Sequence, residues 1–221
     1  MGYHLNFTLI WRNFDKLAYG LLYSFELAII AIALGILIGF SLAVIYVESG
    51  KVIRSIISLY VEIIRNVPLL LLVYLVFYGL PAAIDLSYSA TTSFIVTLAI
   101  YAGAYLVEVF RSGLDAVPHG LIDAGKSIGL TPIQRLVNVR LPSMLRITLP
   151  SLSNTFVSLF KDTSVASVIA VPELTYGAQW INHNTFRIAE IYMVVTVMYL
   201  TSGYLILIIL RRVEKWYGVD R

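Results

Sequence analysis

Long apolar runs separated by short charged segments form the basic pattern of this chain. Four uncharged stretches reach the roughly 20 residues that a helix needs to cross a hydrocarbon core. They cover residues 27–47, 66–84, 86–107 and 191–210. A fifth stretch, residues 147–171, is as long but contains Pro150, Lys161 and Asp162. Because such breaks are tolerated where neighbouring helices or water satisfy the backbone, the pattern predicts five membrane-spanning helices.

Composition favours the same fold class. Hydrophobic residues make up 59% of the 221 residues and charged residues only 13%, whereas a soluble domain is about one quarter charged. So few charges could not cover this much apolar surface in water. We therefore expect an all-α, polytopic transmembrane bundle that forms a single domain over residues 1–221. Turns are expected at residues 48–50, 79–81, 87–93 and 172–184.

The basic residues predict an orientation. Cytoplasmic loops of membrane proteins are enriched in Lys and Arg. With five spans and a cytoplasmic C-terminus, 12 of the 16 basic residues lie inside, and Arg12, Lys16, Lys161 and Arg187 lie outside. The N-terminus is then extracytoplasmic. The basic loops and the net charge of +3 indicate membrane orientation and not nucleic-acid binding.

Several kinds of chemistry are not expected. The chain has no cysteine, so it has no disulfide, no thiolate metal ligand and no cysteine nucleophile. His4, His119 and His183 are far apart in the sequence, and no metal site is predicted. No cofactor and no catalytic residue are predicted in this chain, which is therefore not expected to be an enzyme.

The segment from about residue 111 to 146 is predicted to form two short helices at the membrane surface. Pro118 fits the first position of one helix, and Gly129 fits its end. Apolar and small residues follow one face of that helix, with polar residues opposite. Thr131, Pro132 and Gln134 fit the start of a second helix with a capping box. This helix is expected to end near residue 140, at the Leu-Pro pair 141–142.

Residues 120–127 match the phosphate-binding pattern G-x-x-x-x-G-K-[ST] letter for letter. That loop needs a buried strand before it, a helix after it and a second strand that carries an acidic residue to Mg²⁺. The membrane spans leave no room for such a sheet. Nucleotide binding by this segment is therefore rejected.

The same segment resembles the cytoplasmic EAA loop of ABC importer permeases. The family pattern is E-A-A, three residues, G, nine residues, I, one residue, L-P. Here Asp123-Ala124-Gly125 is followed at the same spacing by Gly129, Val139 and Leu141-Pro142. Residues 62–70, 105–117 and 160–169 resemble further blocks of the polar amino acid branch, the histidine, glutamine and arginine type.

The resemblance implies a permease subunit of an ATP-driven importer in the bacterial cytoplasmic (inner) membrane. Its implied partners are two ABC ATPase subunits that bind ATP and Mg²⁺, an identical or similar permease subunit, an extracytoplasmic substrate-binding protein and a small polar amino acid. The EAA loop would be the coupling helix that docks on the ATPase. The residues expected to serve this coupling are Gly120, Asp123, Ala124, Gly125, Lys126, Gly129, Leu141 and Pro142. An amphipathic helix resting on lipid is the simpler alternative.

A second set of residues is predicted to line the translocation path. It consists of Arg65, Pro68, Asn154, Thr155, Ser158, Lys161 and Asp162. Ionisable residues within spans mark functional paths by default. Members of the branch that carry cationic amino acids tend to have glutamate after this Ser-Asn pair, where Thr155 stands here. The resemblance thus implies neutral or acidic cargo. For the polar residues, hydrogen bonds to neighbouring helices are an equally good explanation.

Other features have structural explanations that compete with functional ones. Glu62 with Arg65 and Glu108 with Arg111 are three residues apart, so each pair can form an ion pair on one helix face. Residues 35 and 39 form a G-x-x-x-G pair that close helix packing explains. Two other functions stay open for the whole chain. It could be a secondary transporter or channel subunit, although no matching pair of interrupted helices is evident, or a membrane anchor of a protein complex.

Overall fold

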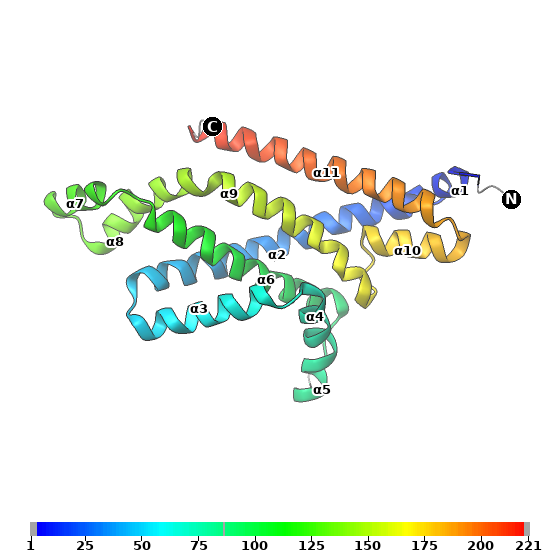
Figure 1. Cartoon of the computed structure of the whole chain (residues 1–221), viewed down its shortest axis with the longest axis horizontal. Coiled ribbons are helices and arrows are strands. Elements are labelled where there is room, and N and C mark those ends of the chain that lie inside the picture. Colours follow the sequence, from blue (N-terminus) through cyan, green and yellow to red (C-terminus); the bar gives the residue numbers. More distant parts are fainter. Residues whose placement is uncertain (1–3, 86, 219–221) are drawn as a thin grey trace.

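The computed structural model describes residues 4–85 and 87–218, and every regular element in that part of the chain is helical (Figure 1). The helices of the first half are α1 (Thr8–Trp11), α2 (Phe14–Glu48), α3 (Lys51–Asn66), α4 (Leu69–Tyr74), the π-helix η1 (Leu75–Gly79), α5 (Leu80–Ile84) and α6 (Ala90–Asp115). Those of the second half are α7 (His119–Ser127), α8 (Pro132–Arg135), the π-helix η2 (Leu136–Arg140), α9 (Leu141–Asp162), the 3₁₀-helix η3 (Thr163–Ile169), α10 (Leu174–Thr185) and α11 (Ile188–Trp216).

Three helices in the described part, α2, α6 and α11, are long and apolar enough to cross a membrane. A fourth candidate consists of α3 together with α4 to α5, which bend by 103° relative to each other. The predicted second span, residues 66–84, is therefore only one arm of a bent pair. The bend follows from Pro68, because proline disfavours the helical conformation of the residue before it, and Val67 is extended at φ −97° and ψ 130°. Residue 86, where the third span was predicted to begin, lies outside the described residues.

Two Leu-Pro pairs that were predicted as helix ends lie inside continuous helical segments. Pro81 follows η1, and Pro142 follows η2. A proline lacks an N–H and clashes with the carbonyl four residues before it. A preceding π-turn, with its i→i+5 bonding, widens the helix and leaves room for the ring. The expected turn at residues 79–81 and the expected end at Leu141-Pro142 were therefore wrong.

The predicted turn over residues 172–184 also proved wrong, because this segment forms most of α10. Glu173 caps that helix: its carboxylate accepts hydrogen bonds from the backbone N–H groups of Thr175 at 2.9 Å and Tyr176 at 2.8 Å. The same carboxylate accepts a hydrogen bond from the hydroxyl of Tyr199 in α11 at 2.8 Å and another from that of Ser24 in α2 at 3.4 Å. A fully buried carboxylate thus joins three helices, which apolar periodicity could not predict.

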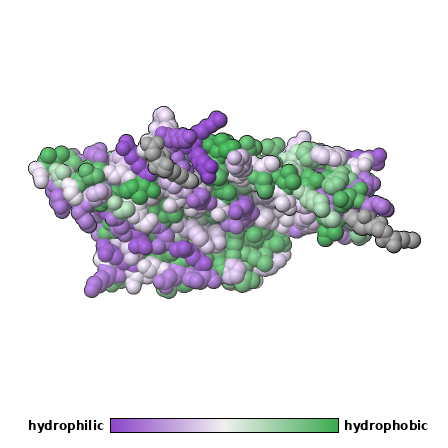
Figure 2. All heavy atoms as spheres, turned by 45° about the horizontal axis from the view of Figure 1, so that its top comes forward, coloured by the Kyte–Doolittle hydropathy of each residue, from purple (hydrophilic) through white to green (hydrophobic). Residues whose placement is uncertain are grey.

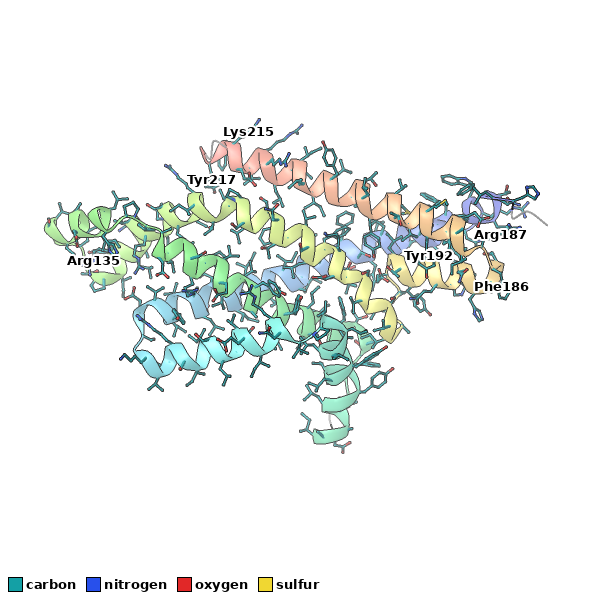
Figure 3. All side chains as sticks on the ribbon, viewed as in Figure 1. Arg135, Phe186, Arg187, Tyr192, Lys215 and Tyr217 are labelled. Carbon is teal, nitrogen blue, oxygen red and sulfur yellow. The ribbon has the colours of Figure 1, made fainter. Side chains whose placement is uncertain are left out.

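The two ends of the bundle differ in content. α7 and α8 lie at one end, toward which the C-terminal end of α11 points, and α1 and α10 lie at the opposite end (Figure 1). Figure 3 shows Arg135 and Lys215 at the first end and Arg187 at the second. The helices between them run lengthwise, apart from the arm of α4 and α5, which projects sideways.

Close packing of α2 against α6 forms the centre of the fold. Gly35 and Gly39 are buried, and a Cβ atom added at either would stand 2.6 Å from the Cβ of Ala102 or Leu106, respectively. Only glycine lets the two backbones approach this closely. The packing explanation of the G-x-x-x-G pair is confirmed.

Replacing Gly39 by leucine is expected to destabilise the chain by about 1–3 kcal/mol, because the new side chain cannot fit against Leu106. The measurement is thermal unfolding of the purified protein in detergent. Gly120→Ala is the control, since no atom lies within 4 Å of an added Cβ there and alanine favours a helix. Equal melting temperatures for Gly39→Leu and the unmodified chain would contradict the packing described.

Candidate functional site

A polar stripe runs along α6, a helix that is otherwise apolar enough to span a membrane. Tyr101, Tyr105, Glu108, Arg111 and Asp115 are spaced three or four residues apart and therefore share one face. Polar and ionisable groups inside a span face a bundle interior or water and not lipid. The stripe thus marks the face of α6 that is expected to lie toward the bundle interior or water and not toward lipid. Its spacing was visible in the sequence, although the prediction used only Glu108 and Arg111.

The first cavity on this stripe has a volume of about 390 Å³ and lies between α6 and α9. Its lining residues are Tyr101, Tyr105, Asn154, Thr155, Ser158, Leu159 and Asp162. Four of the seven predicted path residues are therefore brought together here. Lys161 is exposed and does not line the cavity, although it precedes Asp162 directly.

Hydrogen bonds arrange the walls of this cavity. The Tyr101 hydroxyl donates to that of Tyr105 at 3.1 Å, so the two rings form one wall from α6. Thr155 donates its own hydroxyl to the carbonyl of Ser151 at 2.9 Å, within α9. The opposite wall offers an amide, hydroxyls and the carboxylate of Asp162, all of which can bind a small polar molecule.

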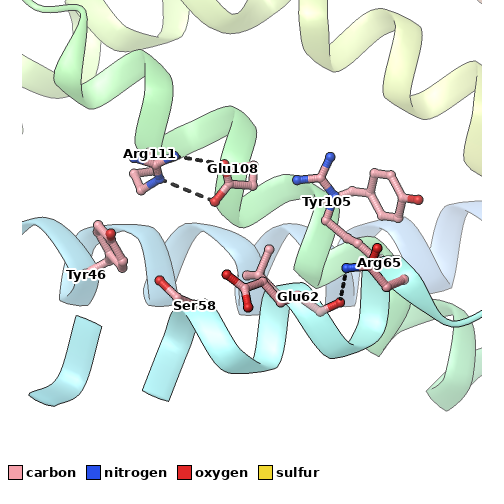
Figure 4. Close-up of a pocket in the computed structure, with 9 residues that line it drawn as sticks. Tyr46, Ser58, Glu62, Arg65, Tyr105, Glu108 and Arg111 are labelled. Atoms are coloured by element: carbon pink, nitrogen blue, oxygen red, sulfur yellow. Dashed lines mark hydrogen bonds and ion pairs between the residues drawn. The ribbon is translucent and has the colours of Figure 1, made fainter. Parts of the chain in front are cut away.

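A second cavity, of about 490 Å³, lies farther along the stripe among α2, α3 and α6. It is lined by Tyr46, Ser58, Val61, Glu62, Arg65, Asn66, Tyr105, Glu108 and Arg111, and Figure 4 shows these residues around it. Tyr105 lines both cavities, so they adjoin. Of the remaining predicted path residues, Arg65 lies here, whereas Pro68 lines neither cavity and instead sits at the bend after α3.

The charges in the second cavity are arranged differently from the prediction. Arg111 donates to Glu108 at 2.9 and 3.3 Å, so this predicted pair is confirmed. Among the described ion pairs none joins Glu62 to Arg65, although they are also three residues apart. The Arg65 guanidinium instead lies over the Tyr105 ring, 5.0 Å from its centroid. Attraction to the electron-rich face of a phenol draws Arg65 toward α6 and away from its own helix.

The predicted surface helix is α7, and its start differs by one residue from the prediction. Pro118 is the N-cap, with ψ 130°, and the helix begins at His119. Gly129 has φ +77°, which glycine adopts without strain, and it ends the helix as predicted. The capping box of Thr131 and Gln134 is present at α8, as predicted.

Residues 120–127, which match the phosphate-loop pattern, are part of α7. Their N–H groups are therefore mostly used inside a helix and do not line a loop cradle. Lys126 bonds to Asp123 at 2.9 Å, and this bond holds the pKa of the Asp123 carboxyl below its usual value.

The tip formed by α7 and α8 exposes apolar side chains. Ile128 is 76% exposed and Ile133 is 73% exposed, on either side of Gly129. Leu121 and Val137 are also about half exposed. Figure 2 shows apolar atoms at this tip. Gly125 is buried against the side chain of Arg135. The predicted apolar face is therefore partly packed against the protein and partly exposed.

One helical segment joins the tip to the first cavity. α8, η2 and α9 follow one another without a break from Pro132 to Asp162, so the α8 part of the tip and the residues lining the cavity belong to the same rod. Two contacts hold this rod. Arg140 pairs with Glu48 at 2.7 Å near the tip, and Ser153 donates to the buried Glu214 of α11 at 2.6 Å. A displacement of the tip would therefore move the cavity wall.

Comparisons with known proteins agree with this arrangement. A probable glutamine ABC transporter permease protein of Bacillus subtilis (strain 168) is 35% identical over 198 residues, which cover 88% of this chain and 90% of that protein. The glutamine transport system permease protein of Escherichia coli (strain K12) is 32% identical over 211 residues, covering 95% and 96%.

A solved structure of an amino acid ABC transporter with histidines matches with a TM-score of 0.88 and 29% identity, covering 96% of this chain and 99% of that one. The family model for the binding-protein-dependent transport system inner membrane component matches residues 21–219. This chain belongs to the family of binding-protein-dependent transport system inner membrane components.

Proposed function

We propose that the chain is the membrane-spanning permease subunit of an ATP-driven ABC importer for polar amino acids. The polar stripe on α6, which passes two cavities inside an apolar bundle, is the observation that supports a transport path. The family match and the amino acid permeases among its relatives support the class of transporter. Hydrolysis of ATP belongs to partner subunits in this proposal, and the chain itself carries the path.

The proposed topology has five spans, an extracytoplasmic N-terminus and a cytoplasmic C-terminus. α2, α6 and α11 would each cross once, the bent pair would form the second span, and α9 with η3 would form the fourth. The predicted excess of basic residues on the cytoplasmic side supports this orientation. So does the position of Arg135 and Lys215 at the end where α7 and α8 lie. Arg221, one of the inside basic residues, lies outside the described residues.

The tip of α7 and α8 is proposed to dock on the ATPase. Exposed isoleucines flanking a glycine bend suit a protein interface better than bulk water. The coupling residues predicted from the sequence all lie in α7, at the bend, or at the start of α9. Two ATPase copies would then serve two permease copies, with one tip on each.

The proposed mechanism is a change of access without chemistry in this chain. Approach of the two ATPases would push the two tips, and the continuous rod from α8 to α9 would pass that motion to the wall that carries Asn154 and Asp162. The path would then open to one side of the membrane or to the other. ATP changes the balance of these states because the ATPases bind it more tightly in one of them.

The chemistry of the first cavity favours a neutral polar amino acid. Asp162 supplies a carboxylate for the ammonium group of a bound amino acid, and Asn154, Thr155 and Ser158 supply groups for a polar side chain. The same carboxylate would repel an acidic side chain, so of the two cargo classes implied by Thr155 the neutral one fits better. A loaded binding protein on the extracytoplasmic side would deliver the cargo.

Uptake by the reconstituted complex tests this function. The chain is assembled in liposomes with candidate ATPases and a substrate-binding protein, and uptake of labelled glutamine, glutamate and lysine is followed with and without ATP. We expect ATP-dependent uptake, with glutamine preferred. Uptake driven by an ion gradient without ATP would indicate a secondary transporter, an ionic current would indicate a channel, and no transport with any partner would favour an anchor.

A further inference from the structure

The second cavity carries charges that take no part in the amino acid binding proposed for the first cavity. The four charged groups in its lining are Glu62, Arg65, Glu108 and Arg111. Arg111 forms an ion pair with Glu108 at 2.9 Å and a second, longer one with Asp115 at 3.5 Å. Glu62 and Arg65 do not pair, although their positions on α3 would allow it. One carboxylate and one guanidinium therefore face the same space with no ionic partner in the described part of the chain (Figure 4).

The geometry of Arg65 leaves its hydrogen bonds available. Its guanidinium stacks on Tyr105, a contact that uses the flat face and leaves the N–H edges free. Arg111 differs, because its N–H groups are occupied by Glu108 and its plane lies over Tyr46. A guanidinium held on an aromatic ring with a free edge is a well-oriented receptor for a carboxylate, which it can bind through two parallel hydrogen bonds.

The balance of charge identifies the class of ligand. Two carboxylates and two guanidinium groups line the cavity, so the charges of its lining sum to zero. After the internal pair is removed, one free charge of each sign remains, on Glu62 and Arg65. A molecule with a carboxylate and an ammonium group complements both. The volume of about 490 Å³ lies within the range of small-molecule sites.

We propose that this cavity is a second binding site for the zwitterionic head of an α-amino acid, with Arg65 receiving the carboxylate and Glu62 the ammonium group. The inference rests on the proposed function, because it takes the cargo to be an amino acid. Tyr105 forms a wall of both cavities, so cargo leaving the Asp162 site passes directly to this one. It then lies between the first cavity and the end of the bundle that carries α7.

The absence of cysteine in the sequence makes a direct test possible. Ser58 lines the second cavity and is replaced by cysteine in the chain assembled with its ATPases in detergent. A water-soluble thiosulfonate reagent then labels this single thiol, and mass spectrometry of the chain measures the rate. The amino acids tested are L-glutamine, L-serine, L-glutamate and L-lysine. We expect at least one of them to slow labelling at least fivefold. The N-acetyl and α-carboxamide derivatives, which lack one charge of the zwitterion, should not slow it.

Three variants separate this site from general effects of the amino acid. Arg65→Gln added to Ser58→Cys should remove the protection, and Arg65→Lys should restore only part of it, because lysine keeps the charge but not the fork. Ser55→Cys, one turn away on α3 and outside the cavity lining, should be labelled without protection.

The outcomes distinguish this proposal from the proposed function. If the complex imports an amino acid but that amino acid does not protect Ser58→Cys, the second site is wrong and the importer stands. If the thiol is not labelled at all, the cavity does not admit water and the second site is again wrong. If uptake also fails for every amino acid, the proposed function fails first.

Discussion

Replacing Ile128 and Ile133 together by aspartate is expected to abolish the stimulation of ATP turnover by loaded binding protein. Both side chains are about three-quarters exposed in the isolated chain, so the replacement should not affect folding. At a docked interface they would be buried, and two carboxylates without partners would oppose docking. Loss of a few kcal/mol of binding corresponds to a fall of roughly tenfold or more in the stimulated rate. The measurement is ATP hydrolysis by the reconstituted complex.

Gly129→Arg tests the same docking at the bend between these two isoleucines. Its φ of +77° means that any side chain there adds strain of about 1–2 kcal/mol, and the arginine would also stand in the interface. Ile128→Val is the matched control and should keep full stimulation, because it preserves an apolar side chain. If the double aspartate variant assembles and is still stimulated normally, the tip does not dock and the proposed coupling element is wrong.

Filling the first cavity with Ser158→Trp is expected to stop transport and to leave ATP turnover intact. The indole ring would occupy the space between α9 and the tyrosine wall of α6, where Tyr101 and Tyr105 lie. Uptake should fall by about tenfold or more, since the indole ring would occupy much of a cavity of about 390 Å³. Binding-protein-stimulated hydrolysis should continue, because the tip of α7 and α8 is unchanged. Parallel assays of uptake and hydrolysis on the same liposomes measure both quantities.

The control for added bulk is Leu200→Trp, on the exposed face of α11. It introduces the same ring away from both cavities and should affect neither uptake nor hydrolysis. Normal uptake by Ser158→Trp would mean that the cargo does not pass between α6 and α9. Loss of both activities, with the complex assembled, would mean that the ring disturbs the rod and not the path.

The tyrosine wall and the charged cavity show how far the pattern of residues could lead. Asn154, Thr155, Ser158 and Asp162 share one face of a single helix, so their gathering could be predicted from spacing. Which helix faces them could not, because hydrophobic periodicity identifies a buried face but not its neighbour. Arg65 illustrates a further limit: its spacing from Glu62 suggested a pair, but its guanidinium lies over a ring on another helix.

The prolines show that the course of the backbone, too, could be predicted only in part from the sequence. Pro68 lies at a bend of 103° between α3 and the run of residues 66–84, which apolar length alone described as a complete span. Pro81 and Pro142, with equally strong local signals for an end, are tolerated because a π-turn precedes each of them. Whether a helix stops, bends or continues at a proline depends on whether neighbouring helices stabilise the altered bonding, and that is a tertiary property.

By itself the amino-acid sequence determined the all-helical membrane class, the helix caps around the tip, the close packing at Gly35 and Gly39, and the family resemblance. These properties depend on local composition, spacing and backbone conformation, which one segment carries alone. Only the tertiary structure decided that Tyr105 lines two adjoining cavities, that α8 of the tip and the cavity wall share one rod, and that Glu62 and Arg65 do not pair with each other. Each of these depends on distances between segments far apart in the chain, which packing sets and periodicity does not encode.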